Sequence, residues 1–213
     1  MTSATPDPAI PATTPADPDG TASDVLPHGG SVRPITRWGD DVMHRTQEPV
    51  TTFDEELRQL AADMVATMYA ADGVGLAACQ IGVDRSIFVF DCPDDNGTMV
   101  KGLVCNPVIY LPEGKDRRLD DDDEGCLSFP GAFVPCARPD CAEVRGQGLD
   151  GSEVRYAGTG LLARCLQHET DHCHGTVFGD RLPRRSYKKL AKQHESRAAE
   201  FPTGWPAVSG GPG

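Results

Sequence analysis

The residues best suited to chemistry lie close together in the segment 167–172, which reads QHETDH. If this segment is helical, His168 and His172 lie one turn apart on one face, and their imidazoles can bind a single metal ion. Glu169 lies beside them and is suited to carry the proton of a water molecule that the metal activates. Two histidines and a glutamate at this spacing also occur on solvated helices, so the surrounding sequence must decide between the two interpretations.

The surrounding sequence predicts a buried helix. Thr159 is a candidate N-cap, apolar residues follow at helical spacing, and the pattern stops at Gly175. An apolar face on this helix carries both histidines toward the core, where imidazoles need polar partners, and a metal ion supplies them. The inward-facing apolar positions are Leu161, Leu162, Cys165 and Leu166.

A catalytic metal site of this type needs about three protein ligands and one open position for water. The metzincin pattern would place its third histidine at position 178, but Phe178 cannot coordinate a metal. A thermolysin-like protease would take a later glutamate, and Glu195 and Glu200 are available, although both lie in a polar, basic segment. This spacing therefore leaves the third ligand open.

Composition limits the class of protein. The 213 residues suffice for one domain with a sizeable core, and the formal net charge of −12 argues against duplex DNA as a general partner. The sequence has no apolar run of membrane-spanning length and no signal-peptide pattern, so we expect a soluble, cytoplasmic protein without a membrane partner. The eight cysteines lack CxxC pairs, which predicts buried free thiols.

Periodicity predicts the elements that position the histidine helix. An amphipathic helix should run from Phe53 to Tyr69, and strands at 86–91 and 102–110 should pair as a hairpin. Two further strands are expected at 142–146 and 153–157, joined by a turn. Residues 1–30 predict a disordered N-terminal extension, and 199–213 a flexible C-terminal tail, because both segments have few large apolar side chains.

Three segments together resemble the signature motifs of the peptide deformylase family. In chain order they are 73–80 (GVGLAACQ), 124–128 (EGCLS) and the QHETDH segment. The resemblance covers about residues 31–195 and implies a catalytic domain at 31–198. It implies an α+β fold with antiparallel β-sheets packed around a central helix that bears the HExxH motif.

The resemblance also implies the roles of individual residues. Cys126 becomes the third metal ligand beside His168 and His172, and Glu169 becomes the acid/base. Gln80 and the backbone N–H of Leu127 become donors to the developing oxyanion. The residues expected to bind the substrate, chiefly its methionine side chain, are Val74, Gly75, Glu124, Leu161 and Cys165. For Glu124, orientation of a metal ligand is an equally open alternative, and core packing is an alternative for Val74, Leu161 and Cys165.

The implied reaction is hydrolysis of the N-formyl group from the initiator methionine of a nascent chain, with release of formate. One divalent metal ion per chain is expected, with Fe²⁺ as the native ion and Zn²⁺, Ni²⁺ or Co²⁺ as compatible ones. Two alternatives stay open at this stage. A zinc endopeptidase of the HExxH type would tolerate loss of Cys126, and a non-catalytic peptide- or ribosome-binding relative would need a defective site.

A basic segment near the C-terminus suggests a further partner. Residues 184–197 carry six lysines and arginines in an acidic protein and should form a helix at about 186–200. This helix is a candidate for docking on ribosomal RNA near the exit of the nascent chain. The alternative is a solvated face whose charge balances the acidic loops.

Overall fold

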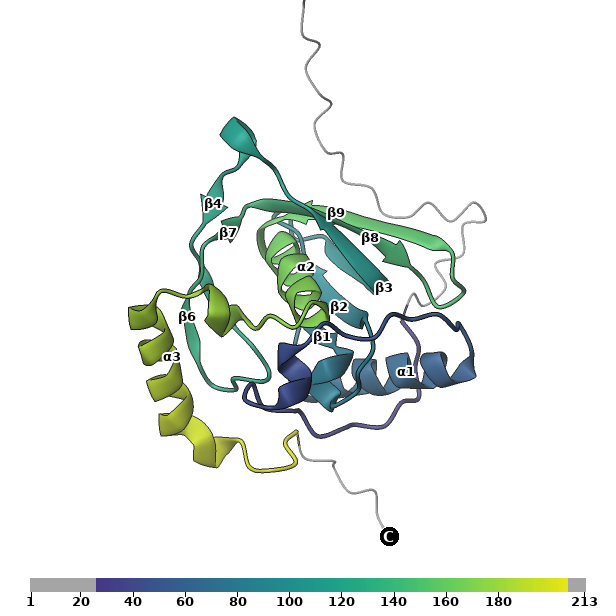
Figure 1. Cartoon of the computed structure of the whole chain (residues 1–213), viewed down its shortest axis with the longest axis horizontal. Helices are drawn as coiled ribbons and strands as arrows, with labels where there is room; N and C mark the ends of the chain where they lie inside the picture. Colours follow the sequence, from purple (N-terminus) through teal and green to yellow (C-terminus); the bar gives the residue numbers. More distant parts are fainter. Residues whose placement is uncertain (1–25, 207–213) are drawn as a thin grey trace, which may run out of the picture.

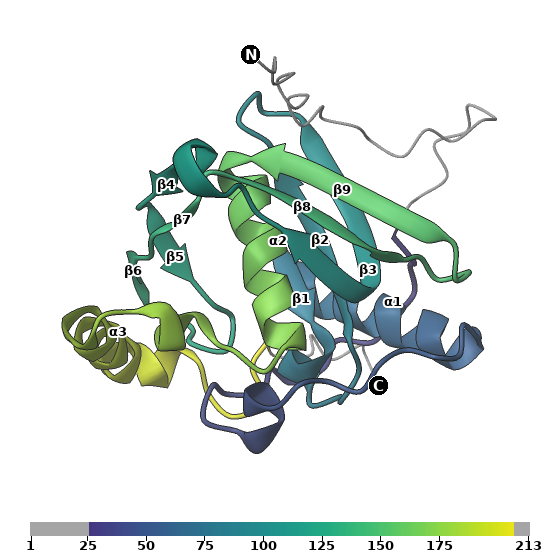
Figure 2. The ribbon, with the colours of Figure 1, turned by 45° about the horizontal axis from the view of Figure 1, so that its top comes forward.

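The computed structural model describes residues 26–206, which form an antiparallel sheet with helices on both faces (Figures 1 and 2). The strand order in the five-stranded sheet is β1-β2-β3-β8-β9. Its strands are β1 (Gly75–Ala77), β2 (Ile87–Pro93), β3 (Met99–Tyr110), β8 (Cys141–Gln147) and β9 (Glu153–Thr159). Two small pairs join β4 (Leu119–Asp120) to β7 (Arg138–Pro139) and β5 (Asp123–Gly125) to β6 (Phe133–Pro135).

The helices lie on different sides of this sheet. The α-helices are α1 (Glu55–Ala70), α2 (Gly160–Cys173) and α3 (Arg184–Arg197). The short 3-10 helices are η1 (Asp41–His44), η2 (Ala78–Ile81), η3 (Gly114–Asp116), η4 (Phe178–Arg181) and η5 (Ala198–Glu200). In Figure 2, α2 lies between the large sheet and the small strand pairs, which makes it the centre of the fold. The expected α+β fold around the HExxH helix is therefore confirmed.

The alternating direction of side chains along β2 explains how one sheet packs against two helices. Ile87 and Val89 point to the face covered by α1, whereas Phe88 and Phe90 point to the face covered by α2. Successive side chains of a strand face opposite sides, so a continuous apolar run serves two cores. The predicted hairpin is confirmed, with Ile87 opposite Cys105 in the β2–β3 register. The predicted strand pair at 142–157 is confirmed as β8 and β9.

The histidine helix α2 is almost entirely buried, as its apolar pattern predicts. Thr159 occupies the N-cap position with extended backbone, but its side chain makes no capping hydrogen bond, which corrects the expected cap. The C-terminal end depends on Gly175, whose φ of +74° is left-handed and whose missing side chain leaves room for the backbone of Arg45. The helix therefore stops where the sequence predicts.

The described structure includes parts of the predicted N-terminal extension and C-terminal tail. Leu26 is buried in the core beneath α1, although it falls in the predicted disordered extension. Trp205 packs against the same core, and its carbonyl accepts a hydrogen bond from Ile35 N–H at 2.8 Å, although it falls in the predicted flexible tail. Single large apolar side chains fix both segments, which an average over composition does not detect. The rest of these predicted segments, 1–25 and 207–213, lies outside the described residues.

Helix α3 lies at the edge of the molecule, away from the large sheet (Figure 1). Its basic side chains are exposed, as predicted, but Leu190 is fully buried and packs with Phe129 and Phe178 in a separate small core. None of the helices between residues 26 and 206 is both long and apolar enough to cross a membrane.

Candidate metal centre

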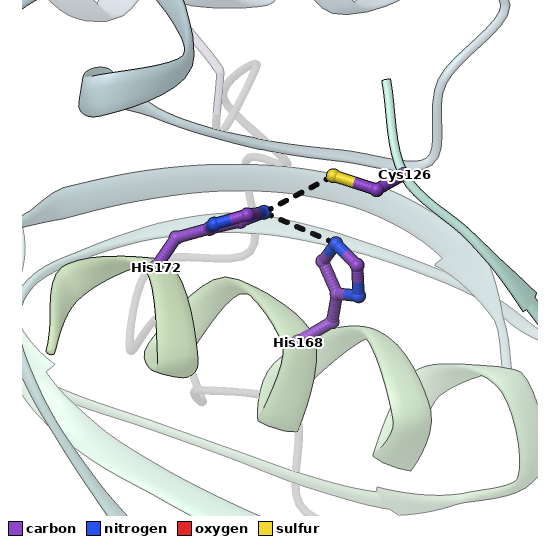
Figure 3. A group of neighbouring side chains, drawn as sticks. All are labelled: Cys126, His168 and His172. Carbon is purple, nitrogen blue, oxygen red and sulfur yellow. Dashed lines mark hydrogen bonds between the residues drawn. The ribbon is translucent and has the colours of Figure 1, made fainter. Parts of the chain in front are cut away.

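Three side chains that are distant in sequence converge beside α2 (Figure 3). Nε2 of His172 lies 3.1 Å from Nε2 of His168 and 3.3 Å from Sγ of Cys126. Tetrahedral coordination with ordinary metal–nitrogen and metal–sulfur bonds would separate these atoms by roughly 3.4 and 3.6 Å. The three donors therefore fit a single divalent ion after small movements, and they are the one such group among residues 26–206.

The histidines reach this point through helix periodicity, and the cysteine through strand pairing. His168 and His172 are separated by one turn of α2, with ring centroids 4.8 Å apart. Cys126 follows directly after β5, which β6 holds in place by pairing Gly125 with Phe133. The thiol is 8% exposed and both imidazoles are buried, so the donors form a site at the base of a cavity.

Glu124 orients the first histidine. Its Oε1 lies 2.7 Å from Nδ1 of His168, so this nitrogen donates a proton and leaves Nε2 free for a metal. Arg138 binds the same carboxylate with two hydrogen bonds of 2.7 Å. Burial opposes ionisation of Glu124, but Arg138 and His168 outweigh it and hold the pKa of this carboxyl far below its usual value. Ligand orientation is thus the alternative that the geometry supports for Glu124, although the residue also borders the cavity.

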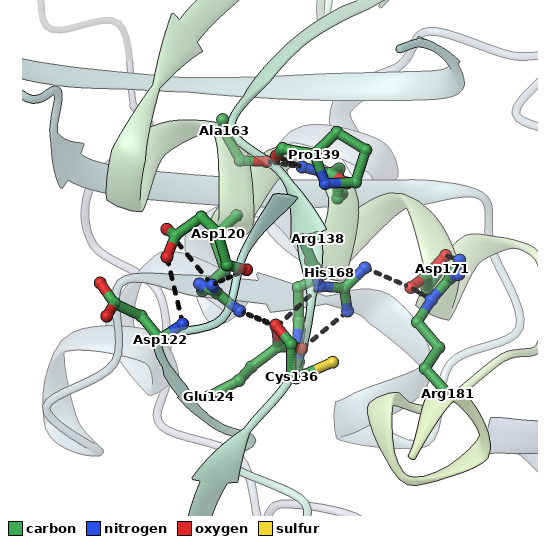
Figure 4. A network of polar contacts seen from close by, with 12 residues as sticks. Asp120, Asp122, Glu124, Cys136, Arg138, Pro139, Ala163, His168, Asp171 and Arg181 are labelled. Atoms are coloured by element: carbon green, nitrogen blue, oxygen red, sulfur yellow. Dashed lines mark hydrogen bonds and ion pairs between the residues drawn. The ribbon is translucent and has the colours of Figure 1, made fainter. Parts of the chain in front are cut away.

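Glu124 belongs to a larger buried network of charges (Figure 4). Arg164 donates to Glu124 at 3.0 Å, and Arg138 donates to Asp171 at 2.9 Å. Arg181 also binds Asp171, through two hydrogen bonds. Because each buried charge has an opposite partner, the network fixes β5 and β7 to α2 without leaving an uncompensated ion. Sequence reasoning missed this network, although an arginine inside the apolar run of α2 was a signal that a buried partner exists.

The proposed acid/base has a distinct environment. Glu169 is 4% exposed, and within residues 26–206 its Oε2 has no hydrogen-bond partner. Burial, partly offset by the nearby positive groups His168 and Arg138, raises the pKa of Glu169 to about 7. A carboxyl whose pKa lies near neutrality can both accept and deliver a proton at physiological pH. Burial and the charge of His168 lower the pKa of His172 well below its usual value, which favours the neutral form that binds metals.

A cleft of about 460 Å³ opens above the metal centre. The residues predicted as functional that border this cleft are Val74, Gly75, Gln80, Glu124, Cys126, Leu127, Leu161, Cys165, His168 and Glu169. His172 is fully buried beneath them. Val74 and Leu161 are 40% and 42% exposed, so their side chains are apolar surface in the cleft and not core packing alone, whereas Cys165 is 4% exposed.

Gln80 is buried beside Cys126. Its Oε1 accepts a hydrogen bond from Ala77 N–H at 2.9 Å, which leaves its Nε2 directed at Sγ of Cys126 (3.5 Å) and Oγ of Ser128 (3.4 Å). The fixed carbonyl means that the amide presents donors, not an acceptor, to the metal centre. Ser128 is a contact that the sequence pattern did not single out.

The rival ligands found in the sequence lie elsewhere. Phe178 packs against the ring of His168, with centroids 5.9 Å apart, so it supports the imidazole without coordinating. Glu200 is paired with Arg197 on the surface, and neither it nor Glu195 joins the donor group. The predicted free thiols are confirmed, because all eight cysteines are free and only Cys141 is half-exposed.

Comparison with known proteins decides the family. The family model for polypeptide deformylase matches residues 32–188. The chain belongs to the polypeptide deformylase family. As a member, it is a hydrolase that removes the formyl group from the N-terminal methionine of newly synthesised peptides.

Named relatives are similar in sequence to the enzyme over most of its length. Peptide deformylase 1 of Streptomyces avermitilis is 52% identical over 174 residues, which are 81% of this chain and 80% of the relative. Peptide deformylase 2 of Corynebacterium efficiens is 50% identical over 166 residues, or 76% of this chain and 86% of the relative. The crystal structure of a peptide deformylase from Legionella pneumophila has a TM-score of 0.70 at 35% identity, and the match covers 80% of this chain and 97% of that one.

Membership in the family also sets the two alternative functions aside. The enzyme acts on the formyl group at the peptide terminus, not on internal peptide bonds as an HExxH endopeptidase would. A non-catalytic relative would be expected to lack part of the site, whereas here Cys126, His168 and Glu169 border one cleft and His172 lies next to the first two.

Proposed function

We propose that Cys126, His168 and His172 hold one divalent cation and that Glu169 is the acid/base for hydrolysis of the formyl amide. The observation that carries this proposal is the convergence of the three donors at the base of a cleft that Glu169 also borders. One thiol and two imidazoles whose ligand atoms lie within 4.8 Å of one another suit a divalent metal, because each can offer it a lone pair.

Ferrous iron is the native ion that we propose, on the basis of the family resemblance. One thiolate and two neutral imidazoles are equally compatible with Zn²⁺, Ni²⁺ and Co²⁺, so the donor set does not select among them. When bound, such a cation polarises the formyl carbonyl and lowers the pKa of a water molecule from ~15.7 toward ~7.

The residues of this chain supply the remaining chemistry. Glu169 accepts the proton of the attacking water and delivers it to the departing amine, for which its buried carboxyl is suitably placed. Gln80 Nε2 and the backbone N–H of Leu127 bind the developing oxyanion, a role worth about 10²- to 10³-fold in rate per donor at other acyl-transfer sites. The hydrogen bond from Ala77 N–H to the Gln80 carbonyl supports this assignment, because it turns the donor end of the amide toward the metal centre.

The methionine side chain occupies the apolar part of the cleft in this proposal. Val74, Leu161 and Cys165 would contact it, and the exposure of the first two in the cleft supports their assignment. Gly75 leaves space beside the carboxylate of Glu169, because a Cβ at position 75 would lie 2.5 Å from Oε1 of that residue. Glu124 acts through His168, which it orients, and not by contact with the substrate.

The test is formate release from formyl-Met-Ala-Ser by anaerobically prepared protein whose metal content is quantified. We expect activity to require one metal ion per chain, to fall about 10²- to 10⁴-fold in Glu169→Ala with metal retained, and to be lost together with the metal in Cys126→Ser. The matched control is Cys141→Ser, which changes a cysteine outside the cluster. Full metal content in Cys126→Ser, or full activity in Glu169→Ala, would refute the assignment.

For the basic helix α3 we propose docking on ribosomal RNA, which would hold the enzyme near its nascent substrates in the cytoplasm. The support is an exposed surface of positive charge formed by Arg184, Arg185, Lys188, Lys189 and Lys192. Cosedimentation with ribosomes should weaken as salt rises and be lost when the three lysines are changed to glutamate. The control is the same charge reversal at Lys101 and Lys115, which are exposed outside α3. Equal binding by both variants would exclude this role.

A further inference from the structure

One wall of the catalytic cleft comes from residues that follow the family match. The match ends at residue 188, yet Arg197, Phe201 and Trp205 line the same cleft as the metal centre. The segment 197–206 thus borders the substrate site, and its contribution is not explained by the proposed ligands or the acid/base.

Several contacts fix this wall in place. Arg37 Nη2 donates to the carbonyl of Phe201 at 2.8 Å, and Ile35 N–H donates to the carbonyl of Trp205 at 2.8 Å. The rings of Phe201 and Trp205 meet edge to face, with centroids 5.0 Å apart. The guanidinium of Arg37 also lies over the Trp205 ring, 5.8 Å from its centroid. The aromatic pair is thus held in one orientation before any substrate binds.

The segment that fixes the wall also contacts the catalytic motifs. Thr36 N–H donates to the carbonyl of Gln80 at 2.8 Å, and Trp38 N–H donates to the carbonyl of Ser128 at 3.2 Å. Beyond the ligand cysteine, Gly131 lies so close to Phe201 that a Cβ there would be 2.7 Å from Cε2 of the ring. The wall, the oxyanion residue and the ligand loop are therefore joined through short backbone contacts.

The side chains of the wall that line the cleft are aromatic apart from Arg197. Arg197 is paired with Glu200 through hydrogen bonds of 3.0 and 2.7 Å, and its guanidinium lies over Phe201. Phe133, 55% exposed, borders the cleft as well. Such a surface favours apolar and aromatic side chains over acidic or basic ones.

We propose that Phe201 and Trp205 form a subsite for the peptide residues that follow the formyl-methionine and that this subsite favours apolar side chains. The inference rests on the proposed function, in which the methionine lies among Val74, Leu161 and Cys165. A peptide held there continues along the same cleft, so the nascent chain itself is the occupant.

The experiment compares formyl-Met-Ala-Phe-Leu with formyl-Met-Ala, using metal-loaded full-length enzyme. The quantity measured is the ratio of their kcat/KM values, the longer peptide over the shorter. In Phe201→Ala and in Trp205→Ala this ratio should fall about 2- to 10-fold. Phe201→Leu, which keeps apolar volume without the ring, should give an intermediate ratio and serves if an alanine variant does not fold. The matched control is Tyr110→Ala, an exposed aromatic residue on β3 outside the cleft.

A ratio in the Phe201 variants equal to that of wild type and Tyr110→Ala would overturn the proposal, even if both rates fall together. The aromatic pair would then serve packing or contact with another protein. A second peptide, formyl-Met-Ala-Asp-Asp, is also compared with formyl-Met-Ala on the wild-type enzyme. Its kcat/KM ratio should be well below that of formyl-Met-Ala-Phe-Leu, and equal ratios would also count against the subsite. Failure of wild type to hydrolyse formyl-Met-Ala would instead contradict the proposed function, so the two outcomes are distinct.

Discussion

Glu124→Gln is expected to weaken metal binding indirectly, because it removes the negative charge that orients His168. The carboxylate accepts from Nδ1 of His168 at 2.7 Å, which fixes the tautomer with Nε2 free for the ion. A glutamine keeps the shape but replaces one oxygen by an NH₂ group, which opposes a donor of Arg138 or His168. Loss of such an orienting partner typically costs 10- to 100-fold in metal affinity, and we expect a value in this range.

The same change should destabilise the metal-free protein. Breaking a buried ion pair by removing one partner costs about 3 to 5 kcal/mol, because the remaining charge stays buried. Here Arg138 keeps its contact with Asp171 at 2.9 Å, and Arg164 keeps Asp120 at 3.3 Å. We therefore expect the lower end, about 3 kcal/mol in the free energy of unfolding, or a fall of about 6 to 12 °C in Tm for a chain of this size.

Two assays separate the effects. Competition against a chelator gives metal affinity, and urea unfolding of the metal-free protein gives stability. The matched control is Glu143→Gln on β8, which removes a buried carboxylate held by Arg145 at 2.6 Å and Arg155 at 2.5 Å but lies outside the cleft. The control should lose stability without a change in metal affinity. Equal metal affinity in Glu124→Gln and wild type would refute the orienting role.

Two other changes test packing and charge. Gly75→Ala places a Cβ 2.5 Å from Oε1 of Glu169 and 2.8 Å from Sγ of Cys165, so formate release should fall at least about 10-fold with metal retained. Gly39→Ala, with open space around it, should not change the rate. Hydrogen bonds from Arg155, partly opposed by burial, lower the pKa of Glu143 from 4.5 to about 2. The loss of unfolding free energy in Glu143→Gln relative to wild type should therefore be largest above pH 4.5 and vanish as the pH falls toward 2. Urea unfolding at a series of pH values measures this loss, and a loss that does not change with pH would contradict the prediction.

Helices and hairpins could be predicted from the sequence because their contacts are local. Three predicted features each depend on residues a few positions apart. They are the apolar spacing of α1 and α2, the continuous apolar runs of β2 and β3, and the end of α2 before Gly175. The contacts near the two ends of the described structure are not local in this sense. Leu26 and Trp205 join the core as single side chains in segments that are otherwise rich in small and polar residues, so composition did not reveal them.

The sequence by itself determined the pair of histidines and the neighbouring glutamate, because the period of one helix brings positions 168 and 172 to the same face. The approach of Cys126 to within 3.3 Å of His172 was decided only by the tertiary structure. The same is true of the contacts from Glu124 to Arg138 and Arg164, which join residues 14 and 40 positions apart. Such contacts depend on how β5 and β7 pack against α2, and no local periodicity encodes that packing.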